Sequence, residues 1–320
     1  MLRCTRSRRI DFAQIHPVLT SSFMNSPSHP EAVPDDTFEW PGASGMLTLR
    51  LYTAGPRKSE ALLVFFPPGG FVMADLDAAD SCLKSLAQEC QVTILAPSYA
   101  VAPEHPFPAA IEDTHAVLKM AAARGSRLRG WTGRHLIVAG IEAGGNLAAV
   151  STLMSRDRLG PKVAGQVLLM PMLDPSMRES RSSPFEPVVR AREAQAFSDA
   201  FRDYLPRAAD RVHPYACPLE SSRMAGLPPA LIVYAEGDAL TAGARTYADK
   251  LERAGVPVQR TALPASELAG VDERCEAAGS DACRDAIKAF LAPFVQPAKP
   301  HPSKSVASVL LSKDPEVPHD

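Results

Sequence analysis

The sequence predicts an α/β protein in which helices cover both faces of a mostly parallel sheet. Apolar runs of strand length alternate along the chain with segments whose apolar residues recur at helical spacing. The strand-like runs are apolar throughout, which is typical of strands buried on both faces of a parallel sheet. A length of 320 residues with 46% hydrophobic residues is enough for one enzyme-sized core.

Local signals place the individual elements in order. An apolar run at 61–66 stops at Pro67-Pro68-Gly69-Gly70, residues 78–89 have helical spacing, and the β-rich run 91–99 ends at a turn. Further strands are expected at 135–139, 163–173, 230–235 and 256–263, and further helices at 109–123, 145–154, 241–254 and 281–294. The last helix is amphipathic, because Cys283, Ile287, Phe290 and Phe294 share one face.

Segments outside this rhythm suggest the domain organisation. Residues 1–45 and about 176–215 are richer in charge, Ser and Pro, so we expect an N-terminal segment and an insertion that form a small helical cap. The main domain is then 46–295. Residues 296–320 contain five prolines and are expected to be a disordered tail. The basic start lacks a secretory apolar core, and Met24 offers a later start site.

Composition excludes several classes of function. A net charge of −2 gives no reason to expect nucleic acid or an anionic membrane as a partner. No apolar run approaches the roughly 20 residues of a membrane span. The six cysteines have no metal-like spacing and suggest thiols in a reducing compartment. We therefore expect a cytoplasmic protein without a metal or a cofactor.

The segment Gly140-Ile141-Glu142-Ala143-Gly144 is the most informative part of the chain. It follows a predicted strand and precedes a predicted helix, with glycines two positions either side of Glu142. A strand, a tight turn and a helix with small flanking residues is the geometry of a nucleophile elbow, where larger side chains would clash. In a serine hydrolase the apex residue is Ser, whereas this chain has Glu142.

Four segments, at 67–71, 99–110, 140–148 and 226–240, match motifs of one enzyme family. Through them the chain resembles the hormone-sensitive-lipase-like esterases of the α/β-hydrolase fold. They match this family's His-Gly-Gly-Gly-Phe motif, its Tyr-Arg-Leu-Ala-Pro-Glu-His-Pro-Phe-Pro-Ala-Ala motif, its elbow, and the strand that leads to its triad Asp. The resemblance covers about residues 45–295 and implies an α/β-hydrolase fold.

The departures from this family fall on the catalytic positions. The resemblance places Glu142 at the nucleophile, Asp238 at the triad acid and Leu268 at the lost histidine. The sequence has no histidine between His213 and His301, so a small shift in alignment restores no base. Asp238 is equally suited to cap the helix that follows it.

The resemblance also maps an oxyanion hole. Its donors correspond to the backbone amides of Gly69, Gly70 and Ala143. Pro67 and Pro68 remove two other amides but not these. We hypothesise that the Glu142 carboxylate folds into this hole and accepts hydrogen bonds from the three amides.

Three classes of function remain open on the sequence. The first is a pseudoenzyme that binds a small apolar or ester-like ligand or a protein partner. The second is a hydrolase, lyase or isomerase that uses Glu142 as an acidic nucleophile or base. The third is an interaction module, and the resemblance implies a homodimer through the final strand and helix.

Overall fold

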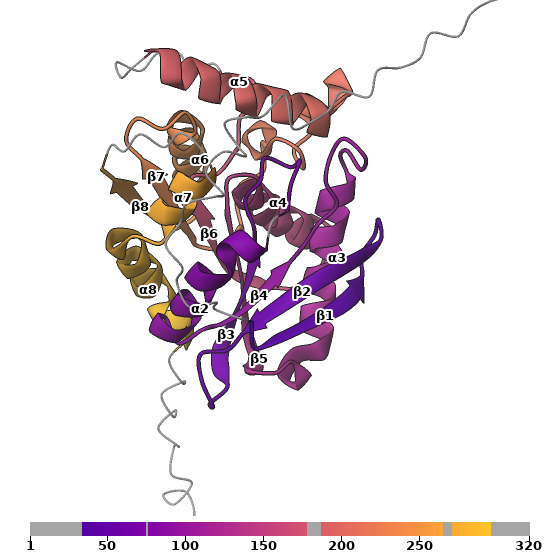
Figure 1. Cartoon of the computed structure of the whole chain (residues 1–320), viewed down its shortest axis with the longest axis vertical. Coiled ribbons are helices and arrows are strands. Elements are labelled where there is room, and N and C mark those ends of the chain that lie inside the picture. Colours follow the sequence, from indigo (N-terminus) through magenta and orange to yellow (C-terminus); the bar gives the residue numbers. More distant parts are fainter. Residues whose placement is uncertain (1–33, 75, 178–186, 265–270, 296–320) are drawn as a thin grey trace, which may run out of the picture.

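A computed structural model of the chain (Figure 1) describes residues 34–74, 76–177, 187–264 and 271–295. These residues contain an eight-stranded sheet in the order β1-β2-β4-β3-β5-β6-β7-β8. Strands β3 to β8 run parallel to one another, whereas β2 is antiparallel to both of its neighbours, β1 and β4. The predicted mostly parallel sheet is therefore confirmed.

The strands agree with the expected order and add two at one edge. Strand β6 ends at Leu169, earlier than expected, because Met170 has a positive φ of 41° and Pro171 follows. Strand β1 lies within the segment that the sequence assigned to the N-terminal region, and it pairs with β2. The strands are β1 (Asp36–Pro41), β2 (Met46–Tyr52), β3 (Ser59–Phe66), β4 (Thr93–Pro97), β5 (Trp131–Ile141), β6 (Val163–Leu169), β7 (Ala230–Ala235) and β8 (Val258–Leu263).

Helices cover both faces of the sheet (Figure 1). On one face α2 and α8 lie together, joined by an ion pair of 3.2 Å between Arg284 and Glu89. On the other face α3 and α4 pack against each other, and the short helix η7 (Pro218–Glu220) lies between α4 and α6. The helices are α2 (Asp80–Glu89), α3 (Ala109–Arg124), α4 (Ala143–Asp157), α5 (Pro187–Tyr204), α6 (Thr241–Arg253), α7 (Val271–Ala278) and α8 (Asp281–Val295).

The central strands form the apolar core that fixes the sheet. The side chains of β4 and β7 are buried along their whole length, as expected for a sheet covered on both faces. The carboxyl ends of the parallel strands meet at one edge, and α5 lies across this end of the molecule (Figure 1). The cap is anchored there by aromatic contact, because the ring of Tyr204 stacks on Phe71 at 3.9 Å.

Several predicted segments lie outside the described residues. These are residues 1–33, most of the predicted N-terminal segment, the part of the insertion at 178–186, and the predicted tail at 296–320. Within the described ranges, no helix combines the length and apolarity needed to cross a bilayer.

Candidate functional site

Glu142 lies at a strained turn between β5 and α4. Its backbone has φ 52° and ψ −116°, a conformation that side chains other than glycine rarely adopt. The flanking glycines permit the close approach that the turn requires. A Cβ atom at Gly144 would lie 2.0 Å from the carbonyl oxygen of Phe66, and one at Gly140 would lie 2.2 Å from the carbonyl carbon of Gly144. The strand–turn–helix geometry expected from the sequence is therefore present.

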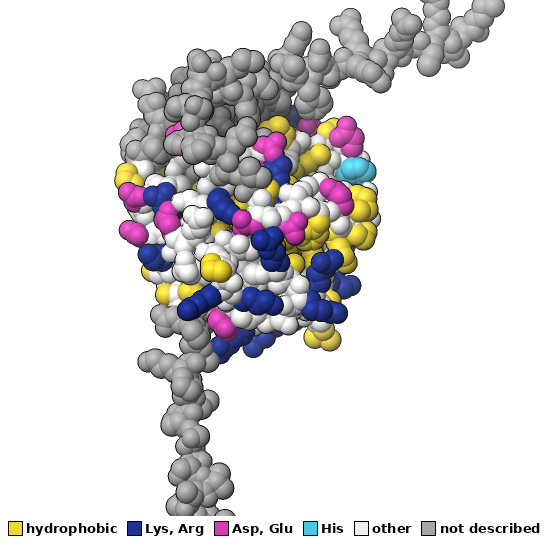
Figure 2. Space-filling view, turned by 60° about the horizontal axis from the view of Figure 1, so that its bottom comes forward, with side chains coloured by type: hydrophobic (Ala, Val, Ile, Leu, Met, Phe, Trp, Pro, Cys, Tyr) yellow, Lys and Arg dark blue, Asp and Glu magenta, His cyan; other side chains and the backbone are white. Residues whose placement is uncertain are grey.

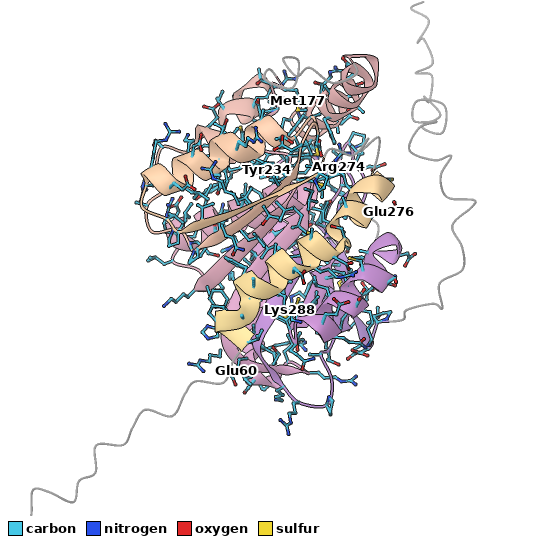
Figure 3. The ribbon with its side chains drawn as sticks, turned by 90° about the vertical axis from the view of Figure 1, so that its left-hand side faces the viewer. Glu60, Met177, Tyr234, Arg274, Glu276 and Lys288 are labelled. Carbon is cyan, nitrogen blue, oxygen red and sulfur yellow. The ribbon has the colours of Figure 1, made fainter. Side chains whose placement is uncertain are left out.

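Arg274 joins Glu142 to Asp238 in a buried cluster of charges. Its Nη1 lies 3.2 Å from Oε1 of Glu142, and its Nη2 lies 3.1 Å from Oδ1 of Asp238. Its Nε also donates to Oδ2 of Asp238 at 3.2 Å, so the guanidinium holds this carboxylate through both oxygens. The three side chains are at most 1% exposed. Figure 3 shows Arg274 in the half of the molecule opposite to Glu60.

Each member of the cluster comes from a different part of the fold. Glu142 follows β5, Asp238 follows β7, and Arg274 is carried by α7. Because β5 and β7 are parallel strands separated only by β6, their carboxyl ends bring the two carboxylates to one edge. Asp238 also accepts a hydrogen bond of 2.9 Å from the amide of Leu240, the residue before α6. Asp238 thus both supports a helix start and binds Arg274.

The cap covers the guanidinium. The ring of Phe197, on α5, lies 4.8 Å from Cζ of Arg274, which is within the range of a cation–π contact. Phe197 and Phe201 on this helix are 7% and 2% exposed, and Phe71 beneath them is fully buried. The aromatic side chains of α5 therefore help to bury the cluster at its Arg274 side.

One of the three expected amide contacts to Glu142 is present. The amide of Gly69 donates to Oε2 at 3.4 Å, a long hydrogen bond. Among the described residues, the amides of Gly70 and Ala143 make no hydrogen bond to this carboxylate. The second oxygen, Oε1, binds Arg274 instead. The carboxylate therefore points to the mapped oxyanion hole but is balanced mainly by a cation that the sequence reasoning missed.

Burial dominates the electrostatics of Glu142. Desolvation raises the pKa of its carboxyl, and the nearby Asp238 charge adds to the rise, while Arg274 and the Gly69 amide oppose it. The hydroxyl of Tyr99, which donates to the carbonyl of Pro67 at 3.0 Å, also has a raised pKa, from burial first and from Glu142 second. Ionised Glu142 therefore depends on Arg274 for its stability.

The cluster has no obvious acceptor for a proton in ester hydrolysis. A guanidinium stays protonated in proteins and cannot act as a general base. In the described part of the chain no histidine hydrogen-bonds to Glu142 or Asp238. His213 accepts a hydrogen bond from the amide of Tyr215 at 3.1 Å and packs against Phe107, so it is engaged elsewhere. Leu268 lies outside the described residues, and its assigned position stays a prediction.

The need for a cation beside two buried carboxylates could have identified Arg274 from the sequence. The resemblance had placed two carboxylates, Glu142 and Asp238, at one strand edge without a histidine, and two buried carboxylates require a cation. Arg274 is the only Lys or Arg between Leu263 and Arg284, the segment that leads back from β8 to this edge. The sequence reasoning did not use this requirement and left 271–278 without an element.

A small cavity among the described residues adjoins Ala239, the neighbour of Asp238. A cavity of about 10 Å³ lies between the segment after β6 and the start of α6, lined by Leu173, Met177, Leu240 and others. This is room for about one water molecule. Within the described residues, no group of three or more His, Cys, Asp or Glu side chains is arranged to hold a metal ion.

Comparison with known proteins assigns the family. A family model described as an alpha/beta hydrolase fold matches residues 63–266, more than half of the chain. The chain belongs to the α/β-hydrolase family. The recognised resemblance to its esterase branch and the predicted α/β-hydrolase fold are thereby confirmed.

Similar α/β-hydrolases are named as esterases. Esterase LipI of Mycobacterium tuberculosis is 34% identical over 241 residues, which are 73% of each chain. Ethyl acetate hydrolase of Pseudomonas putida is 31% identical over 224 residues, 68% of this chain and 69% of the relative. Among solved structures, a Pyrobaculum calidifontis esterase is 30% identical with a TM-score of 0.69, covering 81% of this α/β-hydrolase and 83% of that chain.

Proposed function

We propose that this chain is a non-hydrolytic member of the esterase family, a pseudoenzyme with a degenerate catalytic triad. The observation that supports this most is the buried cluster in which Arg274 binds both Glu142 and Asp238. Serine-type acyl transfer needs a nucleophile, a base that accepts its proton and a carboxylate that orients the base. Here a carboxylate stands at the nucleophile position and a guanidinium, which cannot accept a proton, stands between the two acids.

The esterase names of the relatives supply the opposing expectation, which is ordinary ester hydrolysis. The proposal departs from it because a carboxylate at the elbow has no hydroxyl to acylate. The carboxylate of Glu142 is also buried, since its side chain is 1% exposed, and one of its oxygens already binds Arg274. We therefore expect the family scaffold without the family reaction.

The ligand in this proposal is small and apolar or ester-like. The support for this class is the apolar surroundings of the cluster on the cap side, where Phe71, Phe197 and Phe201 meet. Because all three are buried, a ligand enters only if α5 moves. A cytoplasmic location and a homodimer through β8 and α8 stay part of the proposal; β8 is an edge strand of the sheet.

A second candidate is an enzyme that uses Glu142 as a nucleophile or general base. The raised pKa of this buried carboxyl favours it, because carboxyl groups of raised pKa are frequent among catalytic acids and bases. Arg274 disfavours it by occupying the oxygen that would act. The two candidates differ in whether Glu142→Gln removes a measurable turnover.

The test is hydrolysis of p-nitrophenyl acetate and butyrate by the purified protein, with LipI as the active control. We expect a rate equal to that of buffer and no labelling by a fluorophosphonate probe. Ester hydrolysis that is equally fast in the unaltered protein and in Glu142→Gln would overturn the pseudoenzyme proposal. Labelling by the fluorophosphonate probe would overturn it as well. Turnover that Glu142→Gln abolishes would replace it with the second candidate.

A further inference from the structure

A groove beside the amino ends of β7 and β8 is lined by basic side chains. It has a volume of about 790 Å³, within the range of small-molecule sites, and lies between α6 and the segment that leads to β7. Arg223, Lys250 and Arg253 line it together with the hydroxyl residues Ser222 and Thr246 and the apolar Met224.

The chain direction places this groove at the opposite edge from the buried cluster. Ala225 and Ala254, which also line it, precede the starts of β7 and β8, whereas Glu142 follows the end of the parallel strand β5. Figure 2 looks toward the end of the molecule opposite α5, and dark-blue Lys and Arg side chains gather in the lower part of that view. The groove is therefore separate from the candidate site described above.

Carboxylates do not balance the cations of this groove. Its lining includes no Asp or Glu. The acids on α6 turn elsewhere, because Asp249 and Glu252 each bind Arg260 of β8 at 2.6 Å. Asp157 is close enough for Arg223 to lower its pKa, but Arg156 already holds it at 2.8 Å and contributes more.

The hydrogen bonds of the three cations leave most of their donors available. Lys250 donates to the carbonyl of Leu219, and Nε of Arg253 donates to the carbonyl of Asp249 at 3.1 Å. The guanidinium of Arg223 makes no hydrogen bond or ion pair with the described residues. Arg223 is exposed, and only its backbone is fixed, by the Ser221 hydroxyl and by Arg156.

The helix dipole explains only part of this arrangement. Lys250 and Arg253 lie in the last turn of α6, where cations stabilise the negative end of a helix. Arg223 belongs to a different segment and has no such role, yet it lines the same groove. Three cations in a groove whose lining includes no acid give it a positive potential, which favours an anionic ligand.

We propose that this groove binds a small organic phosphate. Arg223, Lys250 and Arg253 would hold the phosphate, which carries up to two charges and three strong acceptor oxygens. Ser222 and Thr246 would add hydroxyl donors. Met224 and the two alanines would contact the organic part. A single carboxylate has too few oxygens for donors spread over two segments, so the phosphate matches this set better.

The experiment is calorimetric titration of the full chain with phenyl phosphate and with inorganic phosphate at low ionic strength. We expect phenyl phosphate to bind, and to bind at least about tenfold more weakly to the double variant Arg223→Gln/Lys250→Gln, because two charge-assisted contacts are lost. Lys288→Gln, an exposed lysine on α8 away from the groove (Figure 3), is the matched control and should bind as the unaltered protein does. Equal affinity in the double variant, or no binding by the unaltered protein, contradicts a site for free organic phosphate.

A second experiment, with lipid vesicles, distinguishes a free organic phosphate from the phosphate of a lipid headgroup. Sedimentation with phosphatidylglycerol vesicles, compared with phosphatidylcholine, would assign the phosphate to a lipid headgroup if the double variant loses binding and phenyl phosphate does not bind. If neither phosphate binding nor vesicle binding depends on Arg223 and Lys250, the proposal fails. Should the double variant not fold by circular dichroism, Arg223→Gln alone replaces it, since this side chain makes no bond with the described residues. The outcome is independent of the esterase assay.

Discussion

The guanidinium of Arg274 lies 3.2 Å from the carboxylate of Glu142, although 132 residues separate them in the sequence. This contact turns the elbow of an esterase scaffold into the centre of a buried ion cluster. A carboxylate taken out of water is costly unless a cation and hydrogen bonds compensate it. Glu142 at the elbow and Arg274 on α7 are therefore linked energetically, because each compensates the buried charge of the other.

Removal of Arg274 should destabilise the protein strongly. Arg274→Met leaves two buried carboxylates without their cation, and we expect a loss of about 3–5 kcal/mol in the free energy of unfolding. Arg284→Met, which removes a partly exposed arginine from surface ion pairs, should cost about 1 kcal/mol or less. Urea unfolding measures both. Equal effects of the two variants would show that the buried cluster has no special weight.

The same cluster predicts coupling between its members. The variant Arg274→Met/Glu142→Gln lacks one buried charge of each sign, so it should be less destabilised than the sum of the two single variants. We expect an interaction energy of about 1–3 kcal/mol from the double-mutant cycle. An additive double variant would contradict direct contact between the two side chains.

Stability should fall with rising pH because of Glu142. Its pKa is raised in the folded protein above the ordinary value of 4.5, so the folded state keeps a proton that the unfolded chain has already lost. The contribution of this group is fully present below pH 4.5 and is lost as pH rises through the folded pKa. The side chain of Glu142→Gln cannot ionise. The unfolding free energy of this variant should therefore increase relative to that of the unaltered protein as pH rises from 4.5 to neutrality. If the unfolding free energy of Glu142→Gln instead falls relative to that of the unaltered protein over this range, Arg274 outweighs burial.

The Glu142 side chain should be replaceable by a free carboxylate. Glu142→Gly removes the carboxylate and suits the positive φ, leaving Arg274 and the Gly69 amide to face a void. Acetate should bind there and raise the melting temperature of this variant more than equimolar chloride does, because a ligand bound only by the folded state stabilises it. The unaltered protein, whose own carboxylate fills the place, is the control. No acetate-specific rise in the variant would argue against an anion site at this position.

The fold could be predicted further than the site. Uniformly apolar runs located the central strands, and β7 begins and ends where the pattern placed it, because burial on both faces leaves a clear signal. Strand β1 was missed because it is an exposed edge strand with alternating burial and a terminal Pro41. Arg274 was missed because a lone arginine in a charged segment resembles a surface residue. Only the three-dimensional meeting of β5, β7 and α7 shows that it is buried.

The last prediction concerns reactivation. The resemblance alone suggests that Ser at 142 and His at 268 would restore weak esterase activity. The structure indicates that Arg274 must also be removed. Arg274 binds Asp238 through both carboxylate oxygens and so keeps it from orienting an imidazole.

We therefore expect Glu142→Ser/Leu268→His to stay inactive toward p-nitrophenyl acetate, and the same variant with Arg274→Ala to show slow turnover and fluorophosphonate labelling. The triple variant with Asp238→Asn is the control, because it lacks the orienting acid and should lose most of the recovered rate. If the double variant already hydrolyses the ester as fast as the triple variant does, then Arg274 does not block the triad, and the proposed inactivity does not depend on the ion cluster.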